Sequence, residues 1–184
     1  MRLLTQTRVL GLDGLRWLRE RLNAAGRASQ RLLVLGDGGF CVAKLFHELP
    51  GDIDLMARCA RNRALYALPN NEKGRRRDRK RKYGEKARKP HEWLAERSGW
   101  RRTEFMVRSR AVRPRYRIEG LFVLERAPDR PVVLVVVKGV DHGSSRRHRK
   151  RRDPSFFLVT VIQNEERWTL PFAAAKLLAW MWQR

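Results

Sequence analysis

The sequence predicts a mixed α/β fold in which one parallel strand–helix–strand unit is followed by a mainly antiparallel sheet. The short apolar runs at residues 31–36 and 53–57 are typical of buried strands, and residues 40–48 between them have helical spacing. A helical connection this short between two buried strands predicts that they pair in parallel. Later runs rich in Val, Phe and Leu, separated by Pro, Gly and Asp, predict antiparallel strands at 103–108, 116–124, 131–137 and 156–162.

Three further segments are expected to be helical. Leucines recur at helical spacing over Leu12–Ala28, which predicts an amphipathic helix with Asp13 as its N-cap and Gly26 near its end. A short helix is expected over 91–98, and a last one over 170–184. Because no Gly, Asn or Pro stop signal closes the last segment, we expect the chain to end inside that helix.

The strong basic excess limits the classes of protein to which the chain can belong. Among 184 residues, 42 Lys and Arg stand against 19 Asp and Glu, and the net charge of +23 favours a polyanionic partner. The longest apolar run, residues 131–137, is far shorter than the roughly 18 residues of a membrane span, and no signal peptide is expected. The only cysteines, Cys41 and Cys59, exclude a disulfide scaffold and a zinc site and fit a reducing cytosol.

The positive charge is concentrated in three windows. Residues 73–89 hold eleven Lys or Arg and two acids, residues 101–117 hold seven Arg and one Glu, and residues 146–152 hold six Lys or Arg and no acid. Such runs are either solvated segments or surfaces that bind phosphates in a salt-sensitive way. Tyr83 and Trp93 flank the first window, where they could stack on bases or pack inside the protein.

Asp37 is the residue most able to carry chemistry. It follows a buried strand at the edge where open α/β sheets bind ligands, and two glycines come directly after it. A carboxylate there could hold Mg²⁺. It could equally cap the helix that follows. A phosphate-binding glycine loop is a third interpretation, but the segment GDGG lacks the G-x-G-x-x-G pattern and an acid would repel phosphate.

The other acids and the histidines carry weaker signals. Asp52 and Asp54 flank the start of the second strand, which is the wrong end for a site shared with Asp37. None of the four histidines stands at a recognisable spacing from a Ser or Cys, so a nucleophilic triad is not supported.

Several segments, in order and spacing, resemble the DDE-superfamily transposases of bacterial insertion sequences. In the first half these are LVLGDGGF at 33–40, Leu49-Pro50, IDLMAR at 53–58 and NRALY at 62–66. The segment RKYG at 81–84, together with Lys89-Pro90, is similar to an insertion that one branch of that family has after these segments. Three later segments are similar to the residues that precede the family's third acidic residue: FLVT at 157–160, WTLP at 168–171 and WQR at 182–184.

The resemblance implies a ribonuclease-H-like fold whose Asp, Asp and Glu hold two Mg²⁺ (or Mn²⁺) ions that cut and join DNA. It matches Asp37 to the second Asp and Arg184 to an Arg four residues before the Glu, and Met181 stands where many members have a Tyr. No first Asp and no Glu are matched. The implied organisation is a helix and core strands at 1–69, a basic loop and β-rich insertion at 70–163, and the start of a core helix at 164–184.

These observations lead to one functional expectation and one alternative. We expect a DNA-binding DDE transposase of the bacterial cytoplasm and nucleoid, active in transposition and recombination, truncated and inactive alone, and a homo-oligomer on double-stranded transposon ends. The alternative is a non-enzymatic basic protein that binds nucleic acid. The residues expected to contact DNA are Arg75, Arg76, Arg77, Arg79, Lys80, Arg81, Lys82, Arg146, Arg147, Arg149, Lys150 and Arg184.

Overall fold

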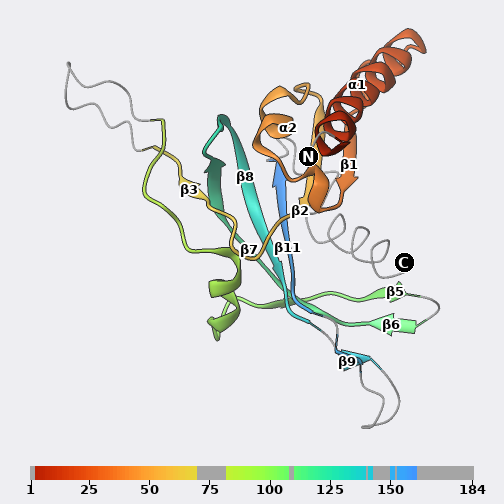
Figure 1. Ribbon diagram of the computed structural model, residues 1–184. Helices are drawn as coiled ribbons and strands as arrows, with labels where there is room; N and C mark the ends of the chain where they lie inside the picture. The colour runs from red at the N-terminus through yellow and green to blue at the C-terminus, as the bar shows by residue number, and fades with distance from the viewer. Residues whose placement is uncertain are drawn as a thin grey trace, which may run out of the picture.

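The computed structural model describes residues 3–69, 82–107, 110–139, 141–142, 150–151 and 153–160, which form a mixed α/β fold (Figure 1). Its centre is a mixed sheet of seven strands in the order β1-β2-β11-β8-β7-β3, with β4 paired to β7. The strands are β1 (Leu32–Gly36), β2 (Ile53–Arg58), β3 (Tyr66–Ala67), β4 (Arg101–Arg102), β7 (Arg115–Leu124), β8 (Ala127–Val137) and β11 (Ser155–Thr160). Two hairpins lie outside this sheet, β5 (Phe105–Val107) with β6 (Arg110–Val112), and β9 (Asp141–His142) with β10 (Lys150–Arg151).

The predicted parallel pair is confirmed. β1 and β2 run parallel, in a register that extends from Leu32 opposite Ile53 to Gly36 opposite Ala57. β11 is antiparallel to both β2 and β8, and β8 is antiparallel to β7, so the expected antiparallel strands at 116–124 and 131–137, and the described part of the one at 156–162, are confirmed. The strand expected at 103–108 is β5, which pairs with β6 outside the central sheet. Since β11 pairs directly with β2, strands from the first and the last thirds of the chain share one sheet.

The bounds of the elements differ from the predicted ones where prolines and local caps act. β8 begins at Ala127 rather than Pro131, because its register against β7 is shifted between Glu119 and Leu124 and its two prolines fall in this irregular part. The expected helix at 91–98 is a 3-10 helix, η2 (Pro90–Ala95). The expected helix at 170–184 lies outside the described residues.

The first helix corrects two expectations. α1 spans Leu3–Ala24 instead of Leu12–Ala28, so Asp13 lies inside the helix and is not its N-cap. Asp13 instead forms an exposed ion pair with Arg16, 3.6 Å away. Gly26, at a φ of 73°, follows the end of the helix in the left-handed region that terminates many helices. No helix in the described part of the chain has both the length and the apolarity needed to cross a bilayer.

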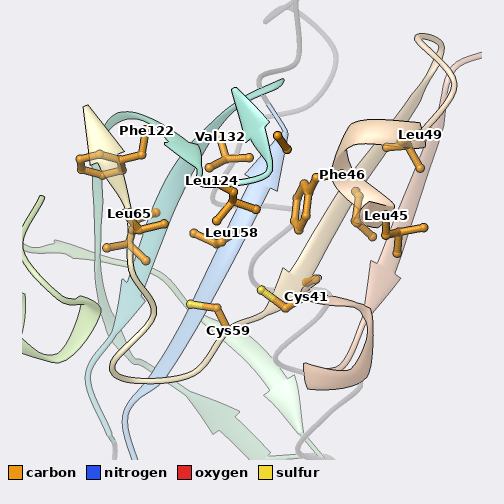
Figure 2. Close-up of a cluster of buried hydrophobic side chains, with 14 of the residues drawn as sticks. Cys41, Leu45, Phe46, Leu49, Cys59, Leu65, Phe122, Leu124, Val132 and Leu158 are labelled. Carbon is orange, nitrogen blue, oxygen red and sulfur yellow. The ribbon is translucent and has the colours of Figure 1, made fainter. Parts of the chain in front are cut away.

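Apolar side chains fill both faces of the central strands. On one face, Phe46 of α2 (Ala43–Glu48) packs with Leu124, Val132 and Leu158 of the sheet, as Figure 2 shows. The other face holds Met56, Val135, Val137, Phe157 and Val159, all buried. Burial on both faces explains why residues 55–57 of β2 and 156–159 of β11 are continuously apolar instead of alternating.

Two ionic contacts fasten the amino-terminal edge of the parallel strands. Asp54, at the start of β2, is buried and paired with Arg31, and its Oδ1 accepts a hydrogen bond of 3.2 Å from the Thr160 hydroxyl. Arg19 of α1 is buried and lies 3.2 Å from Asp52. Both acids that were excluded from the site of Asp37 are therefore engaged in structural contacts at the opposite edge.

Candidate functional site

Asp37 lies at the carboxyl end of β1, as predicted, and it also caps the turn that follows. Its Oδ1 accepts a hydrogen bond of 3.0 Å from the amide of Gly39 in the 3-10 helix η1 (Gly38–Phe40). Asp37 thus lies at the predicted edge of the sheet and also acts as the N-cap of η1. Asp37 is exposed, so its second carboxylate oxygen stays open to solvent or to a ligand.

The turn around Asp37 is tight because Phe40 folds back onto Gly36. A Cβ added at Gly36 would lie 2.5 Å from the Cβ of Phe40, a distance that real side chains do not adopt. On the far side of the turn, a Cβ at Gly38 would lie 3.9 Å from the carbonyl oxygen of Arg58. The sequence GDGG therefore brings the Asp37 turn against the carboxyl end of β2.

A cavity of about 730 Å³ opens at this edge of the sheet. Four segments meet there: the Asp37 turn, the residues that follow β2, the helix η2 and the segment that leads into β11. The lining residues are Gly38, Arg58, Cys59, Ala60, Arg61, His91, Leu94, Asp153, Pro154 and Phe156. Because β11 is antiparallel to β2, its first residues return to the edge where β2 ends, and they bring Asp153 with them.

The cavity carries more positive than negative charge. Arg58 and Arg61 are exposed, and neither forms an ion pair with any residue in the described ranges. Asp153 is the one acid among the described lining residues. His91 holds the Arg61 segment in place, since its ring Nδ1 lies 2.7 Å from the Arg61 carbonyl oxygen.

The described residues do not fit a complete two-metal centre. No three His, Cys, Asp or Glu side chains in the described part of the chain are grouped closely enough to hold a metal ion. Two-metal phosphodiester chemistry needs several carboxylates around ions roughly 3.5–4 Å apart. Asp37 can supply one ligand, and any others would have to come from outside the residues described.

Most of the residues expected to contact DNA lie outside the described ranges. These are Arg75, Arg76, Arg77, Arg79, Lys80, Arg81, Arg146, Arg147, Arg149 and Arg184. Lys82 is described and exposed. Lys150 belongs to β10, where its backbone lies opposite that of His142 in β9.

The aromatic residues beside the first basic window pack inside the protein. Trp93 is half-buried against the core, with the guanidinium of Arg117 5.1 Å from its ring and that of Arg88 at 5.3 Å. Tyr83 lies against Tyr66, with 5.3 Å between the ring centroids. The packing interpretation of these two residues accounts for their positions.

Sequence reasoning missed Arg58, Arg61, His91 and Asp153. Arg58 could have been found, because the rule that singled out Asp37 applies equally to the end of the second parallel strand. His91 and Asp153 approach the cavity from distant parts of the chain. Their approach depends on the return of η2 and β11 to this edge, which no local pattern indicates.

Two buried thiols lie near the cavity, and one of them, Cys59, lines it. Cys41 follows η1 and Cys59 follows β2, and Figure 2 shows their side chains next to each other in the core. A hydrogen bond from the Cys59 thiol lowers the pKa of Cys41 below its usual value. The same contact, together with burial, raises the pKa of Cys59. Of the two thiols, Cys41 is therefore the one that ionises first as the pH rises.

No family model, no curated protein and no solved structure matches this chain.

Proposed function

We propose that the chain is part of a DDE-type transposase with a ribonuclease-H-like core, and that it binds double-stranded DNA at the edge where Asp37 lies. The observation that carries the proposal is the position of an exposed carboxylate at the end of a parallel strand, next to a cavity with two arginines. Ligands bind at this edge in open α/β sheets. The order of the segments that resemble the family supports the same assignment.

Asp37 is suited to be one ligand of a Mg²⁺ or Mn²⁺ ion. Its Oδ1 is fixed by the Gly39 amide, which orients the carboxylate, and the residue is exposed. A hard cation prefers carboxylate oxygens and keeps several of its waters when the protein supplies few ligands. Such an ion would supply electrostatic stabilisation to phosphodiester cleavage in the complete enzyme.

Two of the basic windows, residues 73–89 and 146–152, would provide most of the affinity for DNA. Each Lys or Arg that neutralises a phosphate releases a counterion, so the affinity falls steeply with salt and depends little on sequence. In this proposal the windows bind phosphates of the same duplex that reaches the Asp37 edge. Several copies of the chain would assemble on the transposon ends in the bacterial nucleoid.

The chain alone should not cut DNA, because a single matched carboxylate cannot hold two ions. The test is metal-dependent nicking of a labelled duplex by the purified chain, together with duplex binding at several salt concentrations. The proposal requires salt-dependent binding without nicking, and nicking once the missing carboxylates are supplied in a longer chain. Salt-independent or absent binding would overturn it.

A non-enzymatic nucleic-acid-binding protein is the second candidate. The observation in its favour is that the described residues gather no set of three metal-ligating side chains. The two candidates differ in the role of Asp37. If a longer chain with further acids nicks DNA and Asp37→Asn abolishes the nicking, the transposase proposal stands. If no longer chain nicks, the binding protein is the better description.

A further inference from the structure

We propose that the cavity beside Asp37 binds one nucleotide unit of a nucleic-acid strand, with its phosphate on Arg58 and Arg61 and its sugar or base on the apolar floor. The inference rests on the proposed nucleic-acid binding and names the group that enters this site. It depends on three features of the cavity: its size, its fixed walls and the separation of its charged rim from its apolar floor.

The cavity is the right size for one nucleotide and its walls are held by hydrogen bonds. A volume of about 730 Å³ lies within the range of small-molecule sites in proteins. The amide of Cys59 donates to the carbonyl of Phe156 over 2.8 Å, which joins the ends of β2 and β11. The amide of His91 donates to the carbonyl of Arg61 over 3.1 Å, which joins η2 to the same rim. These contacts preorganise the site before any ligand arrives.

Arginine is the side chain best suited to a phosphate. Its planar guanidinium offers paired N–H donors that match two phosphate oxygens, and it stays charged at any physiological pH. Arg58 and Arg61 both line the cavity, and neither is paired with an acid in the described ranges, so neither must give up an ion pair to bind. The charge-assisted hydrogen bonds are therefore available at little cost.

His91 adds a polar atom on the same side. A carbonyl oxygen can only accept, so the Nδ1 that lies 2.7 Å from the Arg61 carbonyl must carry the proton. This leaves Nε2 of a cavity-lining ring without a hydrogen-bond partner in the described part of the chain. That atom can interact with a hydroxyl or amine of the bound nucleotide.

The remaining lining residues favour a nucleotide over a free phosphate ion as the ligand. Cys59 and Phe156 are buried, and Leu94 is half-buried, so together they give the cavity an apolar floor that a sugar or base would cover. Asp153 would repel a phosphate placed beside it, which directs the phosphate to the Arg58–Arg61 side. Asp153 can then accept a hydrogen bond from the sugar or base. Inorganic phosphate would leave the floor uncovered.

The proposal is tested by titrating the full chain with deoxyadenosine 5′-monophosphate and with inorganic phosphate by calorimetry, at an ionic strength of about 0.15 M, where distant charges are screened. The nucleotide should bind at least about tenfold more tightly than inorganic phosphate, because only the nucleotide covers apolar surface. The double variant Arg58→Gln, Arg61→Gln should weaken nucleotide binding about tenfold or more, since charge-assisted hydrogen bonds are lost.

The matched control is Arg27→Gln, Arg126→Gln, which removes the same charge from exposed positions that lie outside the basic windows and do not line the cavity. It should leave nucleotide affinity within about twofold. A second measurement needs no variant: the nucleotide should protect Arg58 and Arg61 of the native chain, but not the exposed Arg27, from the arginine reagent phenylglyoxal. Protection is read for each peptide by mass spectrometry.

The outcomes separate this inference from the proposed function. If both double variants lose affinity equally, if the two arginines are not protected, or if inorganic phosphate binds as tightly as the nucleotide, the cavity assignment is wrong. Salt-dependent duplex binding would still stand in that case. If the nucleotide protects Arg58 and Arg61 but the chain does not bind duplex DNA, the cavity site holds and the proposed function fails.

Discussion

Arg31 and Asp54 form an ion pair at the amino-terminal edge of the parallel strands, with Arg31 Nη2 3.1 Å from Asp54 Oδ2. The carboxylate of Asp54 also accepts a hydrogen bond from Thr160 of β11, and the Thr160 hydroxyl accepts one of 3.0 Å from the Leu55 amide. One buried acid of β2 thus contacts the residue that precedes β1 and the last residue of β11. This edge is opposite to the one where Asp37 lies, which separates the structural acid from the candidate functional one.

Asp54→Ala should destabilise the protein without a direct effect on DNA binding. The side chain of Asp54 is only 6% exposed and that of Arg31 is 29% exposed, so the loss leaves a partly buried charge and an unsatisfied hydroxyl. The free energy of unfolding should fall by about 2–3 kcal/mol, less than for a fully buried pair because Arg31 can still reach water. Urea denaturation measures the change.

The matched control for Asp54 is Asp13→Ala, which removes an exposed acid paired with Arg16 on α1. That change should alter the free energy of unfolding by no more than about 0.5 kcal/mol, as exposed ion pairs contribute little. Equal losses for the two variants would mean that Asp54 has no special structural role.

Two glycines should respond in opposite directions to alanine. At Gly36 a new Cβ would meet the Cβ of Phe40 at 2.5 Å, so Gly36→Ala must displace the turn that holds Asp37 and should cost about 1–3 kcal/mol. At Gly14, inside α1, a Cβ meets nothing within 4 Å, so Gly14→Ala should stabilise the helix by about 0.5–1 kcal/mol. Thermal unfolding of both variants tests the pair, and a neutral Gly36→Ala would contradict the tight turn.

The sequence was most informative where the signal is local. The continuous apolar runs of β1 and β2, with a short helix between them, predicted the parallel pair and placed Asp37 at its carboxyl edge, because burial on two faces and chain connectivity leave few other arrangements. The start of α1 was missed. In a sequence, an aspartate inside a helix looks the same as an aspartate that caps its start. Whether Asp13 is a cap therefore depends on whether the residues before it are helical, and they are.

The cavity could not be predicted from the sequence because its walls depend on tertiary pairing. Asp153 reaches it only because β11 runs antiparallel to β2, and His91 only because η2 is hydrogen-bonded to Arg61. Neither relationship has a signature at short range. Arg58, by contrast, was accessible to the same edge rule that singled out Asp37.

The two thiols near the cavity should titrate at different pH values. In the native chain, the hydrogen bond from Cys59 lowers the pKa of Cys41, so a thiolate should form below the usual value as the pH rises. Cys59→Ala removes the donor and leaves burial as the largest remaining effect, which disfavours the charged form and should raise the pKa of Cys41. The thiolate absorbance near 240 nm, followed against pH, measures the pKa of Cys41 in the native chain and in Cys59→Ala. A lower pKa in Cys59→Ala would show that the two thiols do not interact as described.

The first basic window should determine much of the salt dependence of DNA binding. If about six to ten phosphates are contacted, the affinity should fall roughly a thousandfold or more between about 50 and 200 mM salt. Replacing five arginines of this window by Ser should flatten the slope of log affinity against log salt concentration by several units. These are Arg75, Arg76, Arg77, Arg79 and Arg81. Fluorescence anisotropy with a labelled duplex gives the slope for each protein.

A control with the same loss of charge replaces Arg21, Arg27, Lys44, Arg97 and Arg126, all exposed and outside the three windows. Its slope should change much less than that of the window variant, because counterion release requires charges that lie against phosphates. Equal changes in both variants would mean that the window acts only through net charge.

Asp37→Asn gives the most discriminating test of the candidate site, since it separates the charge of the side chain from its cap. Asparagine caps helices about as well as aspartate, so the hydrogen bond to the Gly39 amide should be kept and the stability should change by less than about 0.5 kcal/mol. Asp37→Ala loses the cap and should cost about 1 kcal/mol. Duplex binding by Asp37→Asn should be unchanged or slightly tighter, because a negative charge near the phosphates is removed.

The proposed function predicts that neither the native chain nor Asp37→Asn nicks DNA with Mg²⁺ or Mn²⁺, because Asp37 is the one carboxylate that the family resemblance matches and a single carboxylate does not hold the ions that phosphodiester cleavage needs. In a longer chain that contains further acids and nicks DNA, Asp37→Asn should abolish cleavage while binding persists. The measurement is nicking of an end-labelled duplex beside anisotropy of the same duplex. Nicking by the 184-residue chain that is lost in Asp37→Asn would mean that further ligands lie within it. Asp153, which lines the cavity beside the Asp37 turn, would then be the first acid to replace.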